Sequence, residues 1–179
     1  MAFHVDYWDH QGWRDRFSDH KYSERQGQYA SWMGLSTIYT PQVVINGERE
    51  FVGSNASAIV KAISNGLEGQ STASVGLSAR IEQGRLYIGH QVSDVEKNTS
   101  LVLALVEKVA HSDVKAGENS GRKLSHVQIV RQLEQIDVNS SKEVEMKLPA
   151  GFNENDFELI GFVQRNADGR IVAATRNEF

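Results

Sequence analysis

Cysteine is absent from this chain of 179 residues. Its absence excludes disulfide bonds, thiolate catalysis and zinc sites built from thiolates within this polypeptide. No apolar run approaches the roughly 18 residues that a membrane-spanning helix needs, and no signal-peptide pattern opens the sequence. The net charge is only −4, and basic and acidic residues are mixed rather than gathered in a basic stripe. We therefore expect no membrane span, no nucleic-acid partner and no cofactor.

Proline is scarce as well, with two in the chain, and the position of Pro41 is informative. It stands just before a β-branched run, Val43–Ile45, which the dipeptide Asn46-Gly47 follows. Asn-Gly accepts positive φ at both residues and is a strong hairpin signal. The stretch Tyr39–Ser54 (YTPQVVINGEREFVGS) thus predicts a turn, a buried strand, a tight turn, a second strand and a helix start. A cis bond is expected at Thr40-Pro41.

The other elements of the first half are a short strand and two helices. The strand is expected at Phe3–Trp8. A helix follows at Ser23–Met33, with Ser23 as its N-cap. The next helix is capped by Ser54 or Asn55 and ends at Asn65-Gly66. Basic residues near the first helix (Arg14, Lys21 and Arg25) are expected on a solvated face.

The second half changes to the alternation typical of strands. Small polar residues at 68–72 indicate a linker, and residues 73–179 predict an immunoglobulin-like antiparallel β-sandwich. The run Leu101–Val109 is suited to its central strand. Val127–Ile136 also fits a helical period weakly, but its β-branched residues favour a strand. Seven strands are expected: Ser74–Ile81, Leu86–Ile88, Leu101–Val109, His126–Ile136, Val144–Leu148, Phe157–Gln164 and Arg170–Thr175.

Several of these motifs together resemble a bacterial family of secreted thioredoxin-like proteins of unknown function. They are HVDYWD, the TPQ-strand-NG hairpin and, downstream, GENSGRKLSHVQIVRQLEQ. The resemblance implies an α/β plus all-β protein: an N-terminally incomplete thioredoxin-like domain at residues 1–67, followed by the sandwich. It also implies a periplasmic or secreted location. The family opens with a strand and a helix that carry Cys-x-x-C, whereas this chain begins at the second strand.

That difference predicts a structural gap. In a thioredoxin-like sheet, the family's first strand lies between the strands that correspond to Phe3–Trp8 and Val43–Ile45. Without it, both strands would expose backbone hydrogen-bonding groups, and open edges of this kind pair readily with other chains. We therefore expect one of three outcomes: another protein or a second copy of this chain associates through the open sheet edge, the strands rearrange, or the first half is poorly stable.

The resemblance also nominates site residues. The backbone at Thr40 and Pro41 would border an extended ligand, and Trp8 would line the cleft. Asp6 corresponds to the carboxylate that accepts a proton near the thiols of complete relatives, and without thiols it has nothing to deprotonate. No residue of this chain is therefore expected to be catalytic.

A metal site is a weak alternative at the start of the chain. His4, Asp6 and His10 share parity along the expected strand, and two imidazoles with a carboxylate can bind a divalent cation. His10, however, lies beyond the expected strand end. We prefer to interpret His4 and Asp6 as hydrogen-bonded polar groups and expect no metal.

Two functions remain open at this point. In the first, the chain is a non-catalytic member or fragment of a family whose complete relatives resemble thiol-disulfide oxidoreductases. In the second, it is a protein-binding or assembly module that acts through the β-sandwich and exposed sheet edges.

Overall fold

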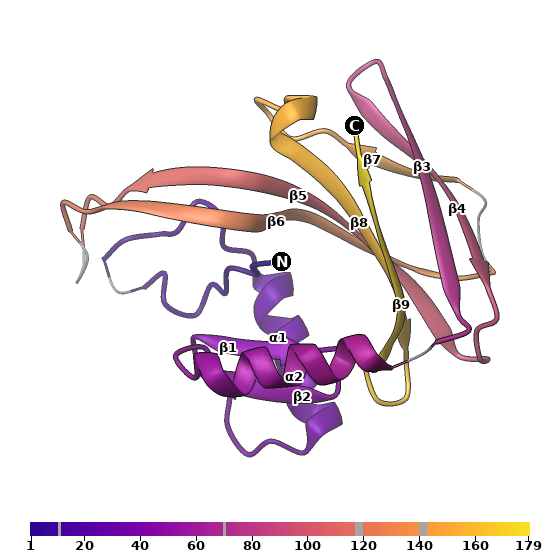
Figure 1. Cartoon of the computed structure of the whole chain (residues 1–179). Helices are drawn as coiled ribbons and strands as arrows, with labels where there is room; N and C mark the ends of the chain where they lie inside the picture. Colours follow the sequence, from indigo (N-terminus) through magenta and orange to yellow (C-terminus); the bar gives the residue numbers. More distant parts are fainter. Residues whose placement is uncertain (11, 70, 117–119, 140–142) are drawn as a thin grey trace.

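The computed structural model describes residues 1–10, 12–69, 71–116, 120–139 and 143–179. The fold is α+β with antiparallel sheets, and two helices and a hairpin lie beside the larger sheet (Figure 1). None of the described helices is long and apolar enough to span a bilayer. The elements are α1 (His20–Met33), β1 (Gln42–Ile45), β2 (Arg49–Val52), α2 (Ala56–Glu68), β3 (Ser74–Glu82), β4 (Arg85–Ser93), β5 (Thr99–Asp113), β6 (Lys123–Asp137), β7 (Glu143–Lys147), a 3-10 turn (Glu154–Asp156), β8 (Phe157–Arg165) and β9 (Ile171–Glu178).

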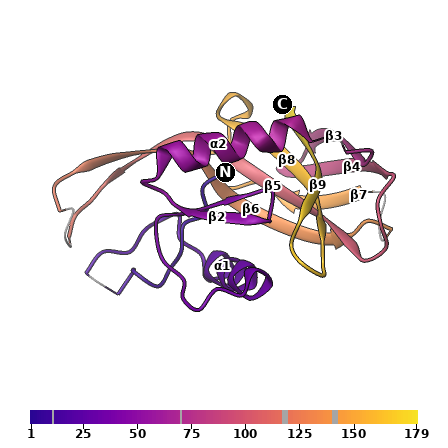
Figure 2. The same ribbon diagram turned by 60° about the horizontal axis from the view of Figure 1, so that its bottom comes forward.

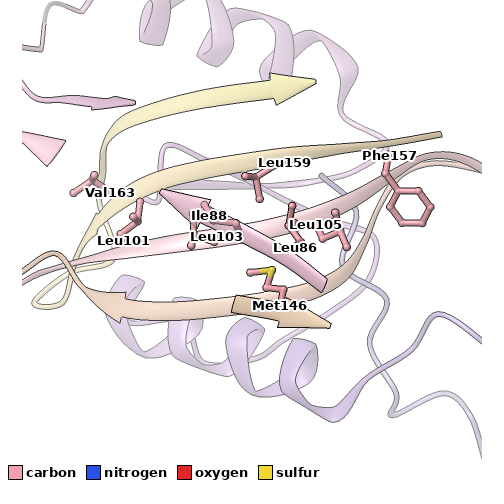
Figure 3. Packing of buried hydrophobic residues seen from close by; sticks show 9 residues of the cluster. All are labelled: Leu86, Ile88, Leu101, Leu103, Leu105, Met146, Phe157, Leu159 and Val163. Atoms are coloured by element: carbon pink, nitrogen blue, oxygen red, sulfur yellow. The ribbon is translucent and has the colours of Figure 1, made fainter. Parts of the chain in front are cut away.

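The second half forms two sheets that pack face to face. Their strand orders are β3-β4-β7 and β6-β5-β8-β9, and every pairing is antiparallel. Alternating side chains of β4 and β5 fill the space between the sheets, together with β7 and β8 (Figure 3). The seven predicted strands are confirmed, including the strand interpretation of β6 and the central place of β5.

Strand β5 is apolar without alternation because both of its faces are buried. Leu101, Leu103 and Leu105 face the three-stranded sheet, while Ala104 and Val106 contact the N-terminal part of the chain. All five are fully buried. Continuous apolar runs are typical of strands covered on both sides. The N-terminal half therefore forms a further layer on the larger sheet (Figure 2).

Both helices form, with shifted ends. Helix α1 begins at His20 and is capped by Asp19, whose side chain accepts from the Lys21 amide. Ser23 is therefore not the cap that we expected. Asn55 does cap α2, but this helix continues through Asn65-Gly66 to Glu68. Gly66 lies inside α2, and its lack of a Cβ lets the helix approach the Asn46 side chain, which a Cβ would meet at 2.9 Å.

The prediction of a strand at Phe3–Trp8 is wrong. Only Ala2 pairs with a strand, through a single parallel bridge to β6, and the chain then turns, with the Asp9 amide donating to the Asp6 carbonyl. A strand needs a ladder partner, and no described strand runs beside Phe3–Trp8. Aspartates also favour local hydrogen bonds over a ladder.

The two halves share buried contacts. Tyr22 of α1 is buried against Ala104, Val106 and Val130, and its hydroxyl donates to the Val130 carbonyl at 3.0 Å. The predicted division at residues 68–72 remains a prediction about independent folding units. The thioredoxin-like and immunoglobulin-like assignments of the two halves likewise remain predictions.

Candidate functional site

A cavity of about 1310 Å³ lies between the N-terminal segment, α1 and β1. Apolar side chains make up most of its wall, and the ends of β8 and β9 and the segments around Val114 and Leu124 close it. The gap that we predicted beside Val43–Ile45 is therefore a cavity in this structure. The wall from α1 consists of residues spaced three and four apart: Tyr22, Arg25, Gln26 and Tyr29.

The loop before β1 borders this cavity. Its Thr40-Pro41 bond is cis, as expected. The Pro41 carbonyl accepts from the Gly53 amide at 2.7 Å, and a Cβ at Gly53 would lie 2.9 Å from the Pro41 Cβ. Trp8 Nε1 donates to Thr40 Oγ1 at 3.1 Å, and the Trp8 side chain is half exposed. Trp8, Thr40 and Pro41 thus meet at one wall of the cavity.

A chain of hydrogen-bonded polar side chains holds the same loop in place. Gln26 Nε2 donates to the Tyr39 carbonyl at 2.7 Å and to Gln42 Oε1 at 2.9 Å, and Gln26 Oε1 accepts from the Tyr7 hydroxyl at 3.0 Å. Gln42 and Tyr39 both donate to Glu50. The hydrogen bond from the Tyr39 hydroxyl to Glu50 raises the pKa of Tyr39. The backbone before Pro41 is therefore fixed by side chains of α1 and the hairpin rather than by a neighbouring strand.

One edge of β1 is unpaired. Strand β1 pairs with β2 alone among the described strands. Because the Pro41 carbonyl bonds to the β2 side, the antiparallel pattern turns the backbone groups of Val43 and Ile45 toward β2 as well. The N–H and C=O groups of Gln42 and Val44 then point away from β2, and no described backbone group bonds to them. All four β1 residues line the cavity.

Asp6 is hydrogen-bonded beside α1. The Ser23 hydroxyl donates to its carboxylate at 2.5 Å and accepts from its amide at 3.1 Å, while His20 Nδ1 lies 3.1 Å away. The Ser23 bond lowers the pKa of Asp6, with a smaller contribution from His20. Asp6 is therefore ionised at neutral pH, and it is not among the residues that line the cavity. Its expected role as a proton acceptor stays a prediction.

The structure does not bring the metal candidates together. His4 Nδ1 lies 2.5 Å from the Asp15 carboxylate, whereas Asp6 bonds to His20 and Ser23. Burial raises the pKa of Asp15, but the bonds from His4 and the Phe17 amide bring it below its usual value. Within the described ranges, no three acidic or imidazole side chains form a group that could hold a metal ion.

Arg25 is the site residue that sequence reasoning missed. We expected it on a solvated face, but only 5% of it is exposed. Its Nη2 donates to the Tyr29 hydroxyl at 2.9 Å and to Gln164 Oε1 at 3.0 Å. Its spacing from Tyr22 and Tyr29 on one helix face was the available signal.

Comparisons with known proteins find similar solved structures and one matching family. The fold is similar to that of protein AGR_C_4864 from Agrobacterium tumefaciens, with a TM-score of 0.69 and 24% identity over 99% of this chain and 78% of that one. A domain of the outer membrane lipoprotein Omp28 from Porphyromonas gingivalis matches at a TM-score of 0.37 and 10% identity, over 62% of this chain and 90% of that one. No curated protein matches. Residues 1–164 match the profile of a family described as a protein of unknown function, DUF1223, and the chain belongs to this family.

Proposed function

We propose that this protein is a non-catalytic binding module that accepts an extended polypeptide segment along the open edge of β1. The observation that carries the proposal is that the open edge lies at the cavity. Strand β1, whose outer backbone groups have no partner among the described strands, forms one wall of this largely apolar space. Strand addition to such an edge supplies main-chain hydrogen bonds, and flanking pockets select the alternate side chains.

The edge is suited to this role because it is held in place before anything binds. Gln26 and Glu50 fix the loop and the first residue of β1, and α2 packs against the hairpin. A preformed edge lowers the conformational cost of binding. A segment beside β1 would find donors and acceptors at Gln42 and Val44 and apolar walls around them.

A second candidate function follows from the resemblance to thioredoxin-like proteins. The β1-β2 hairpin beside the cavity supports a thioredoxin-like interpretation of residues 1–67, and the two facing sheets support an immunoglobulin-like interpretation of the second half. Relatives that carry Cys-x-x-C would then be thiol-disulfide oxidoreductases in the periplasm or outside the cell. This chain has no thiol, so the binding module is the function that we favour here.

Selection from a phage-displayed library of random seven-residue segments tests the proposal on the full chain. The variant Val44→Pro removes an N–H that faces the cavity while leaving the bonds to β2 intact. The matched control Val52→Pro removes an outward N–H on the opposite edge of the hairpin. Circular dichroism should show that both variants keep the fold of the unaltered protein.

We expect enriched segments that bind the unaltered protein and Val52→Pro but not Val44→Pro. Their affinities can be measured by fluorescence anisotropy with synthetic peptides. The absence of any enriched segment, or equal binding to both proline variants, would overturn the proposal.

A further inference from the structure

The inner wall of the cavity contains a buried positive charge without a counter-ion. Arg25 is 5% exposed, and no carboxylate of the described residues lies within ion-pair distance of it. Its Nε is enclosed and makes no hydrogen bond. A guanidinium has five N–H donors, and an unpaired charge out of water is costly. The surroundings of Arg25 therefore leave its charge only partly compensated.

The contacts that Arg25 does make fix its orientation. Its guanidinium carbon lies 5.0 Å from the ring centre of Tyr29, 5.4 Å from that of Phe162 and 5.6 Å from that of Phe3. Both acceptors, the Tyr29 hydroxyl and Gln164 Oε1, bond to Nη2. Nη1 has no hydrogen bond with the described part of the chain and is not among its enclosed atoms. Nη1 is thus the guanidinium nitrogen that remains available for a hydrogen bond, and Arg25 lines the cavity.

The acidic groups of the cavity wall do not neutralise Arg25. Asp15 pairs with His4, and Asp9 accepts from the Ser18 hydroxyl and the Asp15 amide. Both carboxylates belong to the N-terminal segment and accept hydrogen bonds within it. An occupant that reaches α1 would therefore meet aromatic rings and the positive charge of Arg25.

We propose that the segment bound along β1 carries an aspartate or glutamate whose carboxylate pairs with Arg25. This inference rests on the proposed function and specifies the chemistry of the partner. Arginine and a carboxylate form charge-assisted hydrogen bonds that are stronger than neutral ones. One such pair would select an acidic side chain at a fixed position of the segment.

The test uses the segments selected on the unaltered full chain. We expect an acidic residue at one constant position, and replacing it by the isosteric amide (Glu→Gln or Asp→Asn) should weaken binding by at least about tenfold. This comparison changes only the peptide, so it stands even where a variant of Arg25 fails to fold.

Two protein variants assign the effect to Arg25. Arg25→Gln should bind the acidic peptide and its amide analogue with similar affinity, while Arg16→Gln should retain the preference because Arg16 lies outside the cavity wall. Sodium acetate should compete with the acidic peptide only weakly, since a free carboxylate lacks the main-chain contacts.

The outcomes separate the two proposals. Segments that require Val44 but show no acidic preference would overturn the role of Arg25 and leave the binding module standing. Acetate that binds at Arg25 as tightly as the acidic peptide would show that a free carboxylate, not a peptide, is the ligand. A library that yields no segment would overturn both proposals.

Discussion

Tyr22 joins the two halves of this molecule through one hydrogen bond whose removal can be measured. The side chain is 4% exposed, its hydroxyl donates to the Val130 carbonyl at 3.0 Å, and its ring lies edge-on to Phe3 at 5.5 Å. Tyr22→Phe keeps the ring and removes the hydroxyl. The buried carbonyl loses this donor, so we expect the free energy of unfolding to fall by about 1–2 kcal/mol.

Urea unfolding with two probes measures this loss. All three tryptophans lie in the first 32 residues, so fluorescence follows the first half, while far-UV circular dichroism is dominated by the sheets of the second. A loss of this size moves the midpoint by about 0.5–1 M urea. Because Tyr22 contacts both halves, both curves should shift together. A shift of the fluorescence curve alone would show that the halves unfold independently and would refute the reasoning.

A matched control and the pH dependence strengthen this test. Tyr87→Phe removes a hydroxyl that makes no hydrogen bond with the described residues, so its effect should stay within about 0.5 kcal/mol. Burial, with Asp19 nearby, raises the pKa of Tyr22 to about 12 from its usual 10. Its stabilising contribution is complete below pH 10 and is lost as the pH rises toward 12. The difference between the unaltered protein and Tyr22→Phe should therefore shrink across this window.

Three further expectations follow from the site and the core. The purified chain should not reduce insulin disulfides faster than buffer, because the reaction needs a thiolate; turnover that survives removal of contaminating thioredoxin would contradict this. Burial lowers the pKa of His90 and of His126 below 6.5, so the unfolded chain binds protons first and stability should fall as the pH drops below 6.5. Urea titrations at several pH values give the free energy of unfolding as a function of pH. This free energy should fall less steeply with decreasing pH in the variant with glutamine at both positions, and an unchanged pH dependence would contradict the expectation. In hydrogen exchange, the Val44 amide should exchange faster than that of Val43, which faces β2, and equal protection in dilute solution would mean that the outer edge is paired.

The strands of the second half were predictable because their signal is local. Polar and apolar residues alternate in β3 and β6, whereas β5 is continuously apolar because both of its faces are buried. Each pattern can be recognised from the residues of that strand alone. Asn46-Gly47 specified the hairpin by its own backbone preferences. For the same reason, the sequence narrowed the cap of α2 to Ser54 or Asn55, and Asn55 is the cap.

The start of the chain was not predictable in this way. Phe3–Trp8 has the residues of a strand, but a strand forms only where a neighbour offers a ladder, and the neighbour of Ala2 is β6, more than 120 residues away in sequence. Arg25 was placed at the surface because arginine usually is. Its burial depends on Gln164, which is 139 residues distant. Trp8, Thr40 and Pro41 do meet at the cavity, whereas Asp6 does not.

The cavity persists because its walls are anchored to different elements. Ala2 is held by β6, with its amide bonded to Gln128 and its carbonyl to the Val130 amide, so the N-terminal segment cannot move to cover β1 without losing these bonds. On the other side, Gln26 ties the loop before β1 to α1. Closing the space would break hydrogen bonds at both walls and would leave no room for a counter-ion beside Arg25. An occupant that completes the ladder and pairs with Arg25 avoids both costs, which is why the open edge and the unpaired charge point to the same ligand.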